Sequence, residues 1–379
     1  TEFPELFKEG LGRCTKVEVT LPIKDGVVAT HLPAGPIAIP LQEAVEKELK
    51  RLVDNGTLSP VEVSEWATPI VVVRKPNNQI RMCADFSTGL NAALKEVDYP
   101  IPTMEVIMTK FTGNRRLTQL DLSDAYLQLS LDPESRPLTT INTHRGLFQY
   151  NRMVFGLKTA PAIFQRTMEQ ALAGIDGVLV YLDDILVMAP NQESHDRRLR
   201  GVLARLQSWG FRLRFAKCSF DVGCVKYLGL IVDGKGIRAD PSRVEAIRQL
   251  REPSNAAEVR SFLGLVNYYG KFIDQLHRHK PALESLLRKD VPFVWSKEAA
   301  KAFEAIRELL SGPLLLAHYD PQQTLVVAAD ACETGIGGVL LLRYPDGSEK
   351  AVFHLSKALT PAQRNYSQIE KEALALITT

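Results

Sequence analysis

The chain has 379 residues, of which 45% are hydrophobic and 24% are charged. This length predicts two or three domains, and the apolar fraction allows sizeable cores, which excludes a largely disordered chain. The formal net charge is only +2, so any binding of nucleic acid would depend on a locally basic groove and not on the charge of the whole protein.

The cysteines and the apolar segments exclude further classes. There are five cysteines, an odd number, and none forms a Cys-x-x-Cys pair; this indicates reduced thiols in an intracellular protein without a disulfide framework or a zinc site. No apolar stretch reaches about 18 residues, so no membrane span is predicted, and no signal peptide is found. The chain opens on Thr1 without a Met, which suggests a piece of a longer polyprotein.

The first half of the chain predicts an extended lead-in and then helices and strands. Val45, Leu49 and Leu52 have helical spacing, and Asn55 and Gly56 end that helix. In chain order, the predicted elements are a lead-in over 1–40, a helix over 42–53, a hairpin with strands over 66–75 and 79–86 and a turn at Pro76-Asn77-Asn78, a strand over 117–121, and a helix with Thr159 near its cap and Pro161 in its first turn.

The second half predicts a hairpin, a long helical stretch and a return to strands. Ser367 with Glu370 forms a capping box, which gives Glu370 a structural role. The predicted elements are a hairpin over 178–188, an amphipathic helix over 196–209 ended by Gly210, helices from about 241 to 312, a strand over 324–330, a hairpin over 335–342 and 351–356, and a helix that Ser367 opens.

Two adjacent carboxylates, Asp183 and Asp184, lie between apolar runs at or beside the predicted turn of a hairpin. A plain surface turn is one interpretation, because Asp is common in turns. However, the usual two-residue turn requires Gly or Asn at positive φ, and neither is present. Two carboxylates held together repel each other unless a cation lies between them. If Asp121 at the end of strand 117–121 joins them, three carboxylates could hold two Mg²⁺ ions roughly 4 Å apart, as in phosphoryl transfer.

These residues carry a family resemblance. Tyr181-Leu182-Asp183-Asp184 resembles the Tyr-x-Asp-Asp motif of reverse transcriptases, and the segment from Asp121 to Tyr126 resembles their first catalytic motif. The ordered motifs are most similar to gypsy-type LTR retrotransposon polymerases, relatives of the retroviral enzymes, and cover nearly the whole chain. The resemblance implies an α+β fold with a right-hand fingers–palm–thumb polymerase and a truncated RNase H-like α/β domain. The implied domains are fingers and palm over 1–240, a helical thumb over 241–312, and the N-terminal part of the RNase H-like domain over 313–379.

The resemblance also implies roles for individual residues. Asp121, Asp183 and Asp184 would bind two Mg²⁺ ions, for which Mn²⁺ could substitute, and Lys217 would be the general acid near the leaving pyrophosphate. Leu228 and Gly229 would grip the primer. Asp330 and Glu372 would be two metal ligands of an incomplete RNase H site. The residues expected to contact the incoming nucleotide are Lys75 (with Arg74 as an alternative), Arg81, Asp124, Ala125, Tyr126, Phe155, Gly156 and Gln165.

Several of these residues keep a plain structural alternative. For Lys75 and Arg81 the alternative is a solvated hairpin tip, although Arg suits phosphate through its planar fork. Phe155 and Gln165 are equally well explained by ordinary packing, and Tyr126 by packing at a strand end. Phe155 stands where retroviral enzymes carry Gln, so any polar contact from that position is lost.

The function implied is an RNA-directed, and also DNA-directed, DNA polymerase that extends a primer on an RNA or DNA template with dNTPs. No membrane partner is expected, a homodimer stays open, and the expected location is intracellular, in a cytoplasmic retrotransposon particle or alternatively the nucleus. RNase H activity is not expected of this chain. Two rival interpretations remain: a domesticated, inactive nucleic-acid-binding or particle-assembly protein, and an enzyme that copies DNA only.

Overall fold

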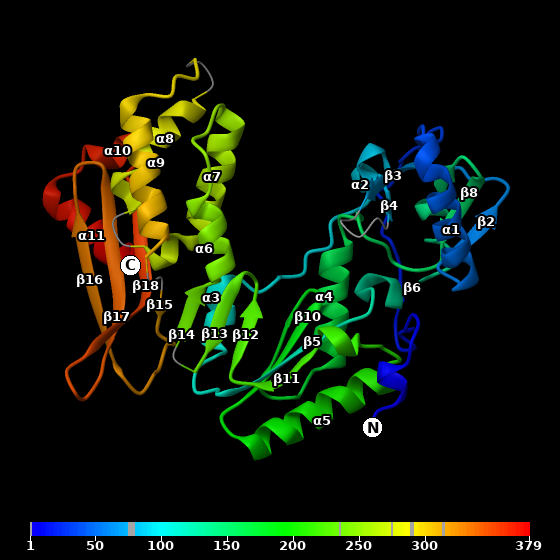
Figure 1. Ribbon diagram of the computed structural model, residues 1–379, viewed down its shortest axis with the longest axis horizontal. Helices are drawn as coiled ribbons and strands as arrows, with labels where there is room; N and C mark the ends of the chain where they lie inside the picture. The colour runs from blue at the N-terminus through cyan, green and yellow to red at the C-terminus, as the bar shows by residue number, and fades with distance from the viewer. Residues whose placement is uncertain (1, 75–79, 235, 274–275, 289–291, 313–314) are drawn as a thin grey trace. The chain divides into compact units, whose positions relative to one another are not determined.

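The protein is described by a computed structural model, which covers residues 2–74, 80–234, 236–273, 276–288, 292–312 and 315–379. The chain divides into two compact units. The first comprises Thr1–Met104 and Arg116–Val222, and the second comprises Glu105–Arg115 and Gly223–Thr379. Each unit is described by itself below, with the element labels of Figure 1.

A four-stranded antiparallel sheet, in the order β11-β5-β10-β9, forms the centre of the first unit. Its strands are β5 (Arg116–Asp121), β9 (Val178–Tyr181), β10 (Asp184–Ala189) and β11 (Ser219–Val222). Alternate residues of a strand point to opposite faces, so Ile185 and Val187 of β10 share one face. They join a buried cluster with the apolar sides of α4 (Ala160–Ala171) and α5 (Gln192–Ser208), which pack beside this sheet (Figure 1).

The second sheet of this unit has five strands in the order β2-β8-β7-β3-β4. The predicted hairpin is present as the antiparallel pair β3–β4, whereas its predicted turn lies outside the described residues. The strands are β2 (Leu58–Val61), β3 (Thr68–Arg74), β4 (Ile80–Ala84), β7 (Ile141–Thr143) and β8 (Gly146–Tyr150). The remaining elements are β1 (Glu18–Val19), β6 (Ser130–Leu131), α1 (Ile39–Asp54), α2 (Leu90–Ala93) and the short 3-10 helices η1 (Glu5–Phe7), η2 (Phe86–Thr88), η3 (Ala125–Gln128), η4 (Pro137–Thr139) and η5 (Phe215–Lys217).

The second unit contains two sheets and a group of helices. One sheet has the order β12-β13-β14-β15, and the other has the order β16-β17-β18. The strands are β12 (Cys224–Tyr227), β13 (Leu230–Asp233), β14 (Gly236–Ala239), β15 (Leu315–Leu316), β16 (Thr324–Ala331), β17 (Gly335–Arg343) and β18 (Glu349–Ala358). The helices are α3 (Met104–Thr109), α6 (Pro241–Arg248), α7 (Ala256–Tyr269), η6 (Gly270–Phe272), η7 (Leu276–Arg278), α8 (Lys280–Glu284), η8 (Ser285–Leu287), α9 (Lys297–Leu310), α10 (Pro361–Arg364) and α11 (Gln368–Thr378).

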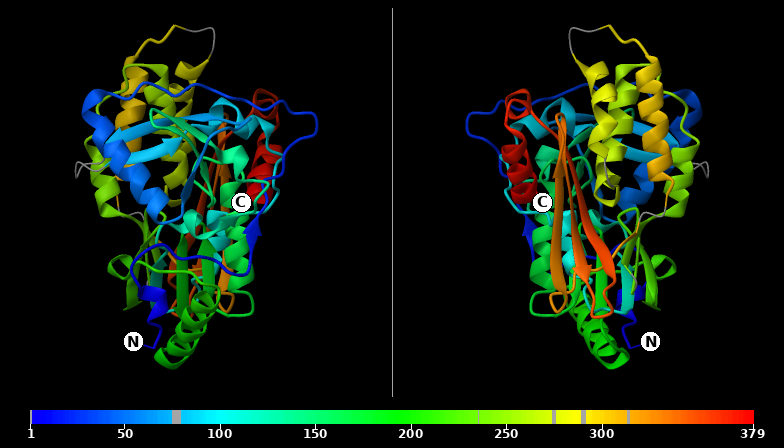
Figure 2. Two further views of the ribbon diagram at one scale, coloured as in Figure 1. Left: turned by 90° about the vertical axis from the view of Figure 1, so that its right-hand side faces the viewer. Right: turned by 90° about the vertical axis from the view of Figure 1, so that its left-hand side faces the viewer.

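Helix α11 packs on the three-stranded sheet of this unit (Figure 2). Ala375 of the helix lies in one buried cluster with Ala331 and Ile336 of the sheet. The predicted capping box is present, because the Ser367 side chain accepts the Glu370 N–H and the Glu370 side chain accepts the Ser367 N–H.

The predicted start of α4 is present, with Thr159 at the N-cap position and Pro161 in the first turn. The Thr159 backbone is in the right-handed helical region, and its side chain makes no capping bond, because a capping side chain needs an extended backbone at that position to reach the next turn. None of the helices in the described part of the chain is long and apolar enough to cross a membrane.

Candidate active site

Three carboxylates meet at one edge of the first unit's four-stranded sheet. In the antiparallel register of β5 and β10, Asp184 lies directly opposite Asp121. Asp184 also pairs with Tyr181, so the turn between β9 and β10 consists of Leu182 and Asp183. The sheet thus brings Asp121 beside the pair, as the sequence predicted it could. Like charges on directly opposed residues of a sheet are destabilising.

The electrostatics of this group are unfavourable for three ionised carboxylates. Burial, together with the charges of Asp184 and Asp121, raises the pKa of Asp183 to about 6. Burial also raises the pKa of Asp184, while a hydrogen bond from Gln119 (3.2 Å) opposes that shift. Asp183 Oδ1 is buried without a hydrogen-bond partner among the described residues. A site that gathers carboxylate oxygens and leaves one unsatisfied suits a hard divalent cation.

The carboxylates are not yet arranged as ligands. Among the described residues, no group of three or more His, Cys, Asp or Glu side chains is placed to hold one metal ion. Because Asp121 and Asp183 lie at the end of a strand and in a turn, rotation of their side chains could bring the oxygens together. The residue types fit Mg²⁺, and the geometry would have to close around it.

A basic segment surrounds the first of these carboxylates. Lys217, at the end of η5, places its Nζ 3.7 Å from Asp121 Oδ2. The Arg214 N–H donates to the Asp121 carbonyl oxygen (2.9 Å), and the Asp121 N–H donates to Cys218 Sγ (3.5 Å). The Lys217 side chain is more than half exposed, so this ion pair adds little stability. Its importance lies in placing an ammonium group within reach of the carboxylates.

A row of side chains leads from β4 to the carboxylates. The Arg81 guanidinium carbon lies 5.9 Å from the centre of the Phe155 ring. Phe155 packs edge-on against Tyr126 (4.7 Å between ring centres), and Tyr126 packs in the same way on Phe164 (5.1 Å). Burial and the nearby Asp183 raise the pKa of Tyr126 to about 12. The fold therefore brings together Arg81, Phe155 and Tyr126, three of the residues predicted to contact the nucleotide.

The other predicted nucleotide contacts are backbone positions with special geometry. Asp124 has a left-handed backbone (φ 49°) and precedes Ala125, the first residue of η3. Gly156 has φ 94°, and a Cβ there would lie 3.4 Å from the Ala84 carbonyl oxygen, so a side chain at this position would be strained. Lys75 lies outside the described residues, and its alternative, Arg74, ends β3.

Gln165 of α4 holds the turn that carries Asp183. This side chain is fully buried; its Oε1 accepts the Leu182 N–H (2.8 Å), and its Nε2 donates to the Val180 carbonyl oxygen (2.8 Å). Leu182 has φ 51°, a conformation that residues other than glycine rarely adopt. One amide side chain therefore bonds both the N–H of the strained residue itself and a carbonyl oxygen of the strand that precedes it. Leu182 thus occupies a position for which two-residue turns usually use Gly or Asn.

Asn91 is a site residue that the sequence did not reveal. Its Nδ2 donates to the Gly156 carbonyl oxygen (2.8 Å), and its Oδ1 accepts the Lys158 N–H (2.9 Å). The amide thus fixes the loop that follows Phe155. No spacing or periodicity marks Asn91, because its partners are far away in the sequence.

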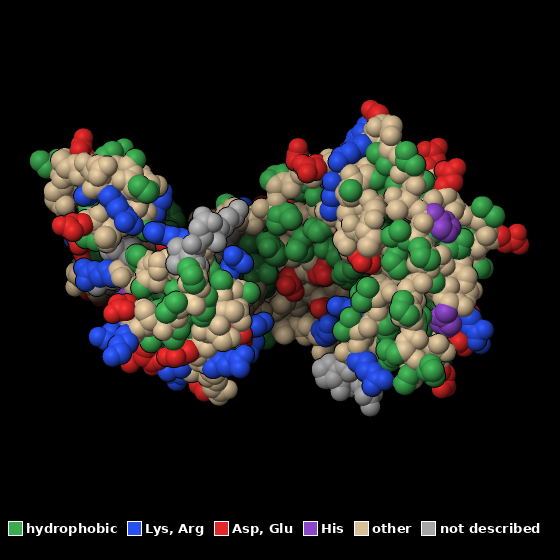
Figure 3. All heavy atoms as spheres, turned by 90° about the horizontal axis from the view of Figure 1, so that it is seen from above, with side chains coloured by type: hydrophobic (Ala, Val, Ile, Leu, Met, Phe, Trp, Pro, Cys, Tyr) green, Lys and Arg blue, Asp and Glu red, His purple; other side chains and the backbone are tan. Residues whose placement is uncertain are grey.

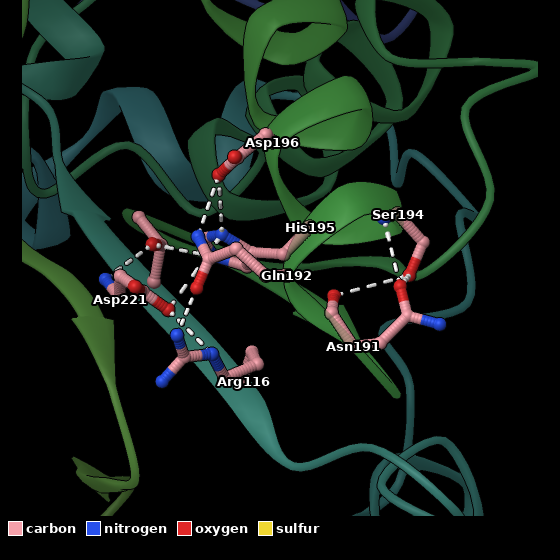
Figure 4. Close-up of polar contacts among 8 residues, drawn as sticks. Arg116, Asn191, Gln192, Ser194, His195, Asp196 and Asp221 are labelled. Atoms are coloured by element: carbon pink, nitrogen blue, oxygen red, sulfur yellow. Dashed lines mark hydrogen bonds and ion pairs between the residues drawn. The ribbon is translucent and has the colours of Figure 1, made fainter.

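A polar cluster lies on the α5 side of β5 (Figure 4). The fully buried His195 of α5 has its Nε2 2.9 Å from Thr118 Oγ1, which also accepts the Asp221 N–H (2.9 Å). The His195 Nδ1 faces the carboxylates of Asp196 (3.6 Å) and Asp221 (3.8 Å). Asp221 also pairs with Arg116 (3.2 Å). These contacts tie α5 and β11 to the strand that carries the first carboxylate.

The remaining predicted site residues belong to the second unit. Leu228 and Gly229 form the two-residue turn between β12 and β13. Asp330 lies near the end of β16, and Glu372 lies in the second turn of α11. Gln368 links their surroundings, since its Nε2 donates to both the Ala331 carbonyl oxygen (2.9 Å) and Glu372 Oε1 (3.2 Å).

Comparison with known proteins shows similarity along most of the chain. Residues 73–232 match the family model "Reverse transcriptase (RNA-dependent DNA polymerase)", and residues 295–379 match "RNase H-like domain found in reverse transcriptase". The chain is 43% identical to uncharacterized protein K02A2.6 of Caenorhabditis elegans, over 72% of this chain and 22% of that protein. It is 31% identical to the Transposon Tf2-3 polyprotein of Schizosaccharomyces pombe, over 96% of this chain and 27% of the polyprotein. The chain thus spans about a quarter of the length of these relatives.

Solved structures share the fold. A foamy viral protease–reverse transcriptase in complex with double-stranded DNA superimposes with a TM-score of 0.88 at 21% identity, covering 98% of this chain and 66% of that chain. The same viral protein in complex with an RNA/DNA hybrid gives 0.84 at 22% identity, covering 98% and 50%. The predicted α+β class, a right-hand polymerase with an RNase H-like region, is confirmed. The chain belongs to the reverse transcriptase family, and its resemblance to transposon polyproteins is likewise confirmed.

Proposed function

We propose that this chain is an RNA-directed DNA polymerase, able to copy DNA as well, that extends a primer with dNTPs. One observation carries this proposal: Asp121 of β5 lies directly opposite Asp184 of β10, and Asp183 lies in the adjoining turn. Reverse transcriptases generally use divalent metal ions, and the residue types of this group fit that use.

Asp121, Asp183 and Asp184 would hold two Mg²⁺ ions, for which Mn²⁺ could substitute. When bound, such ions activate the primer 3′-hydroxyl and neutralise charge on the triphosphate and the leaving group. The pKa of about 6 for Asp183 means that its carboxyl would have to lose its proton as an ion binds, so metal affinity should rise with pH.

The chain's own residues would position the nucleotide. Arg81 would clamp the triphosphate through its guanidinium fork, and the backbone N–H groups near Asp124 and Ala125 would donate to the phosphates. Tyr126 would lie beneath the sugar. Lys217, 3.7 Å from Asp121, would supply a proton to the leaving pyrophosphate. The primer end would rest on the turn at Leu228 and Gly229.

The partners proposed are an RNA or DNA template with its primer, together with dNTPs. The names of the solved relatives support this choice, because those proteins were captured on double-stranded DNA and on an RNA/DNA hybrid. We further propose the division into fingers and palm (1–240), thumb (241–312) and RNase H-like region (313–379), in which Asp330 and Glu372 would bind metal. These two carboxylates alone do not complete a two-metal site.

The direct test is Mg²⁺-dependent primer extension by the purified chain on poly(rA)/oligo(dT), with a DNA template of matched sequence in parallel. Extension on both templates that EDTA abolishes would support the proposal. Extension on DNA alone would replace it with a DNA-directed polymerase. Template binding without extension on either template, in Mg²⁺ or Mn²⁺, would favour an inactive nucleic-acid-binding protein.

A further inference from the structure

The turn between β12 and β13 has an unusual backbone. It consists of Leu228 and Gly229, and both residues have positive φ, 50° and 75° respectively. Two-residue hairpins with positive φ at both positions favour Asn followed by Gly, and a branched apolar residue such as Leu rarely adopts this conformation. The turn therefore requires support from its surroundings.

Two adjacent tyrosines at the end of α7 give that support. The Tyr268 hydroxyl donates to the Leu228 carbonyl oxygen, and the Tyr269 hydroxyl donates to the Gly229 carbonyl oxygen at 3.4 Å. Asp240 also donates its N–H to the latter oxygen, at 3.4 Å. Both hydroxyl oxygens lie within 4 Å of the point where a Cβ on Gly229 would stand. Each carbonyl of the turn therefore has a hydroxyl donor from the same helix.

The helix can hold these hydroxyls in place. Tyr269 is 2% exposed, and its ring lies 6.4 Å from the ring of the buried Phe272, measured between centres. Tyr268 is 38% exposed, and its ring packs edge-on against Tyr269, with ring centres 4.9 Å apart at 87°. The buried ring thus fixes the exposed one, and the pair fixes the orientation of both peptide groups of the turn.

We infer that Tyr268 and Tyr269 are positioning residues, which fix the Leu228–Gly229 backbone and make the placement of the primer end depend on α7. This inference rests on the proposed function, in which the turn contacts the primer terminus. The tyrosines themselves need not touch nucleic acid. Because the turn acts through its backbone, a loss of either hydroxyl should disturb the alignment of the primer hydroxyl more than the affinity for the duplex.

The test uses the 379-residue chain with Tyr268→Phe, Tyr269→Phe and the double substitution, which remove the hydroxyls and keep the rings. We expect the double variant to lower kcat for single-nucleotide addition about 10-fold, with the dNTP KM and the primer–template Kd changed less than about twofold. Tyr366→Phe, at an exposed tyrosine of the same unit, is the matched control and should leave all three constants unchanged.

Rescue separates positioning from other roles of the hydroxyls. Leu228→Asn creates the Asn-Gly pair that this turn prefers, so it should restore most of the kcat lost in the double variant. A double variant with wild-type kcat, or a loss that Leu228→Asn does not restore, would overturn the inference.

A measurement without catalysis distinguishes this inference from the proposed function. Amide hydrogen exchange at Leu228, Gly229 and Leu230 should be at least about fivefold faster in the double phenylalanine variant, because the turn opens more often. Unchanged exchange would overturn the inference even if the wild-type chain were inactive. Faster exchange in a chain that never extends a primer would leave the tyrosine support intact and reject the polymerase function instead.

Discussion

Among single residues, Asp183 tests the metal-binding carboxylates most directly. Asp183→Asn removes a charge that would bind an ion but keeps the size of the side chain. We expect primer extension to fall at least about 1,000-fold, because the ions stabilise charge throughout the transition state. The primer–template Kd, measured by fluorescence anisotropy, should change less than about threefold. Extension near the wild-type rate in a folded variant would show that the site is misassigned.

The raised pKa of Asp183 predicts how the stability of the protein depends on pH. Its pKa is about 6 in the folded chain against an ordinary 3.8, so the folded state binds this proton more tightly than the unfolded state. Its contribution to stability is therefore full below about pH 4 and is lost as pH rises through 6. Since the side chain is partly exposed, we expect the free energy of unfolding to fall by only about 1 kcal/mol from pH 5 to pH 7 because of this residue.

Urea denaturation in EDTA at these two pH values measures that difference. The comparison of wild type with Asp183→Asn isolates the residue, because the variant has no proton to gain at this position. Equal pH dependence in the two proteins would mean that Asp183 titrates normally. Added Mg²⁺ should stabilise the wild type at pH 7 and have less effect on the variant.

Tyr126 has both a packing role and a predicted role in sugar selection. It is only 7% exposed and lies between Phe155 and Phe164, where a rigid ring could exclude a 2′-hydroxyl. Tyr126→Val should lower the ratio of kcat/KM for dATP to that for ATP at least ~10-fold, equivalent to about 1.4 kcal/mol. Tyr126→Phe keeps the ring and should keep the ratio. An unchanged ratio in a folded, active Tyr126→Val chain would leave packing as the only role.

At the scale of elements, the β9–β10 hairpin depends on one amide from α4. Gln165→Leu keeps the volume but leaves the Leu182 N–H and the Val180 carbonyl oxygen without the partners they have in the wild type. We expect a loss of about 2–3 kcal/mol in the free energy of unfolding and a lower kcat, since Asp183 sits in this turn. Gln165→Glu can still accept the Leu182 N–H and should retain more activity than Gln165→Leu. Equal activity of the two variants would contradict this account.

The cluster on the α5 side of β5 predicts another pair of variants. Thr118→Val removes a buried hydroxyl that contacts both His195 and the Asp221 N–H, so unfolding should become easier by about 1–3 kcal/mol. Thr167→Val is the matched control, because this equally buried hydroxyl bonds, within the described part of the chain, to the Ile163 carbonyl oxygen one turn back in α4. Its loss should cost less than about 1 kcal/mol. Similar losses in denaturation experiments would show that the cluster adds nothing.

The elements that the sequence predicted well depend on neighbours along the chain. The Ser367–Glu370 capping box, for example, joins two residues that are three positions apart. The sequence could predict that Asp121 lies opposite Asp184 only if their two strands pair, because strand pairing joins segments that are distant in the chain. Asn91 and Gln165 act through bonds to backbone groups far from them in sequence, and no periodicity records such partners. The left-handed Leu182 shows how such a partner overrides local preference.

For the whole molecule, charge limits how nucleic acid could be held. The net charge is +2, and on the face drawn in Figure 3 the described Lys and Arg side chains stand among Asp and Glu. Binding of a duplex would therefore rely on a modest number of local phosphate contacts. If about five phosphates are neutralised, log K should fall with log salt at a slope of about −4.5. Raising salt fourfold would then weaken primer–template binding about 500-fold.

A variant at Arg81 distinguishes binding of the primer–template duplex from binding of the nucleotide triphosphate. Arg81 is predicted to clamp the incoming nucleotide and not the duplex, so Arg81→Ala should leave the salt slope unchanged in the absence of dNTP. It should raise the dNTP KM about 10-fold, because the planar fork to the phosphates is lost. Anisotropy titrations at several salt concentrations, followed by steady-state extension, measure both quantities. A shallower slope in Arg81→Ala would mean that this arginine contacts the template. An unchanged KM would mean that Arg81 lies on a solvated hairpin and does not bind the nucleotide.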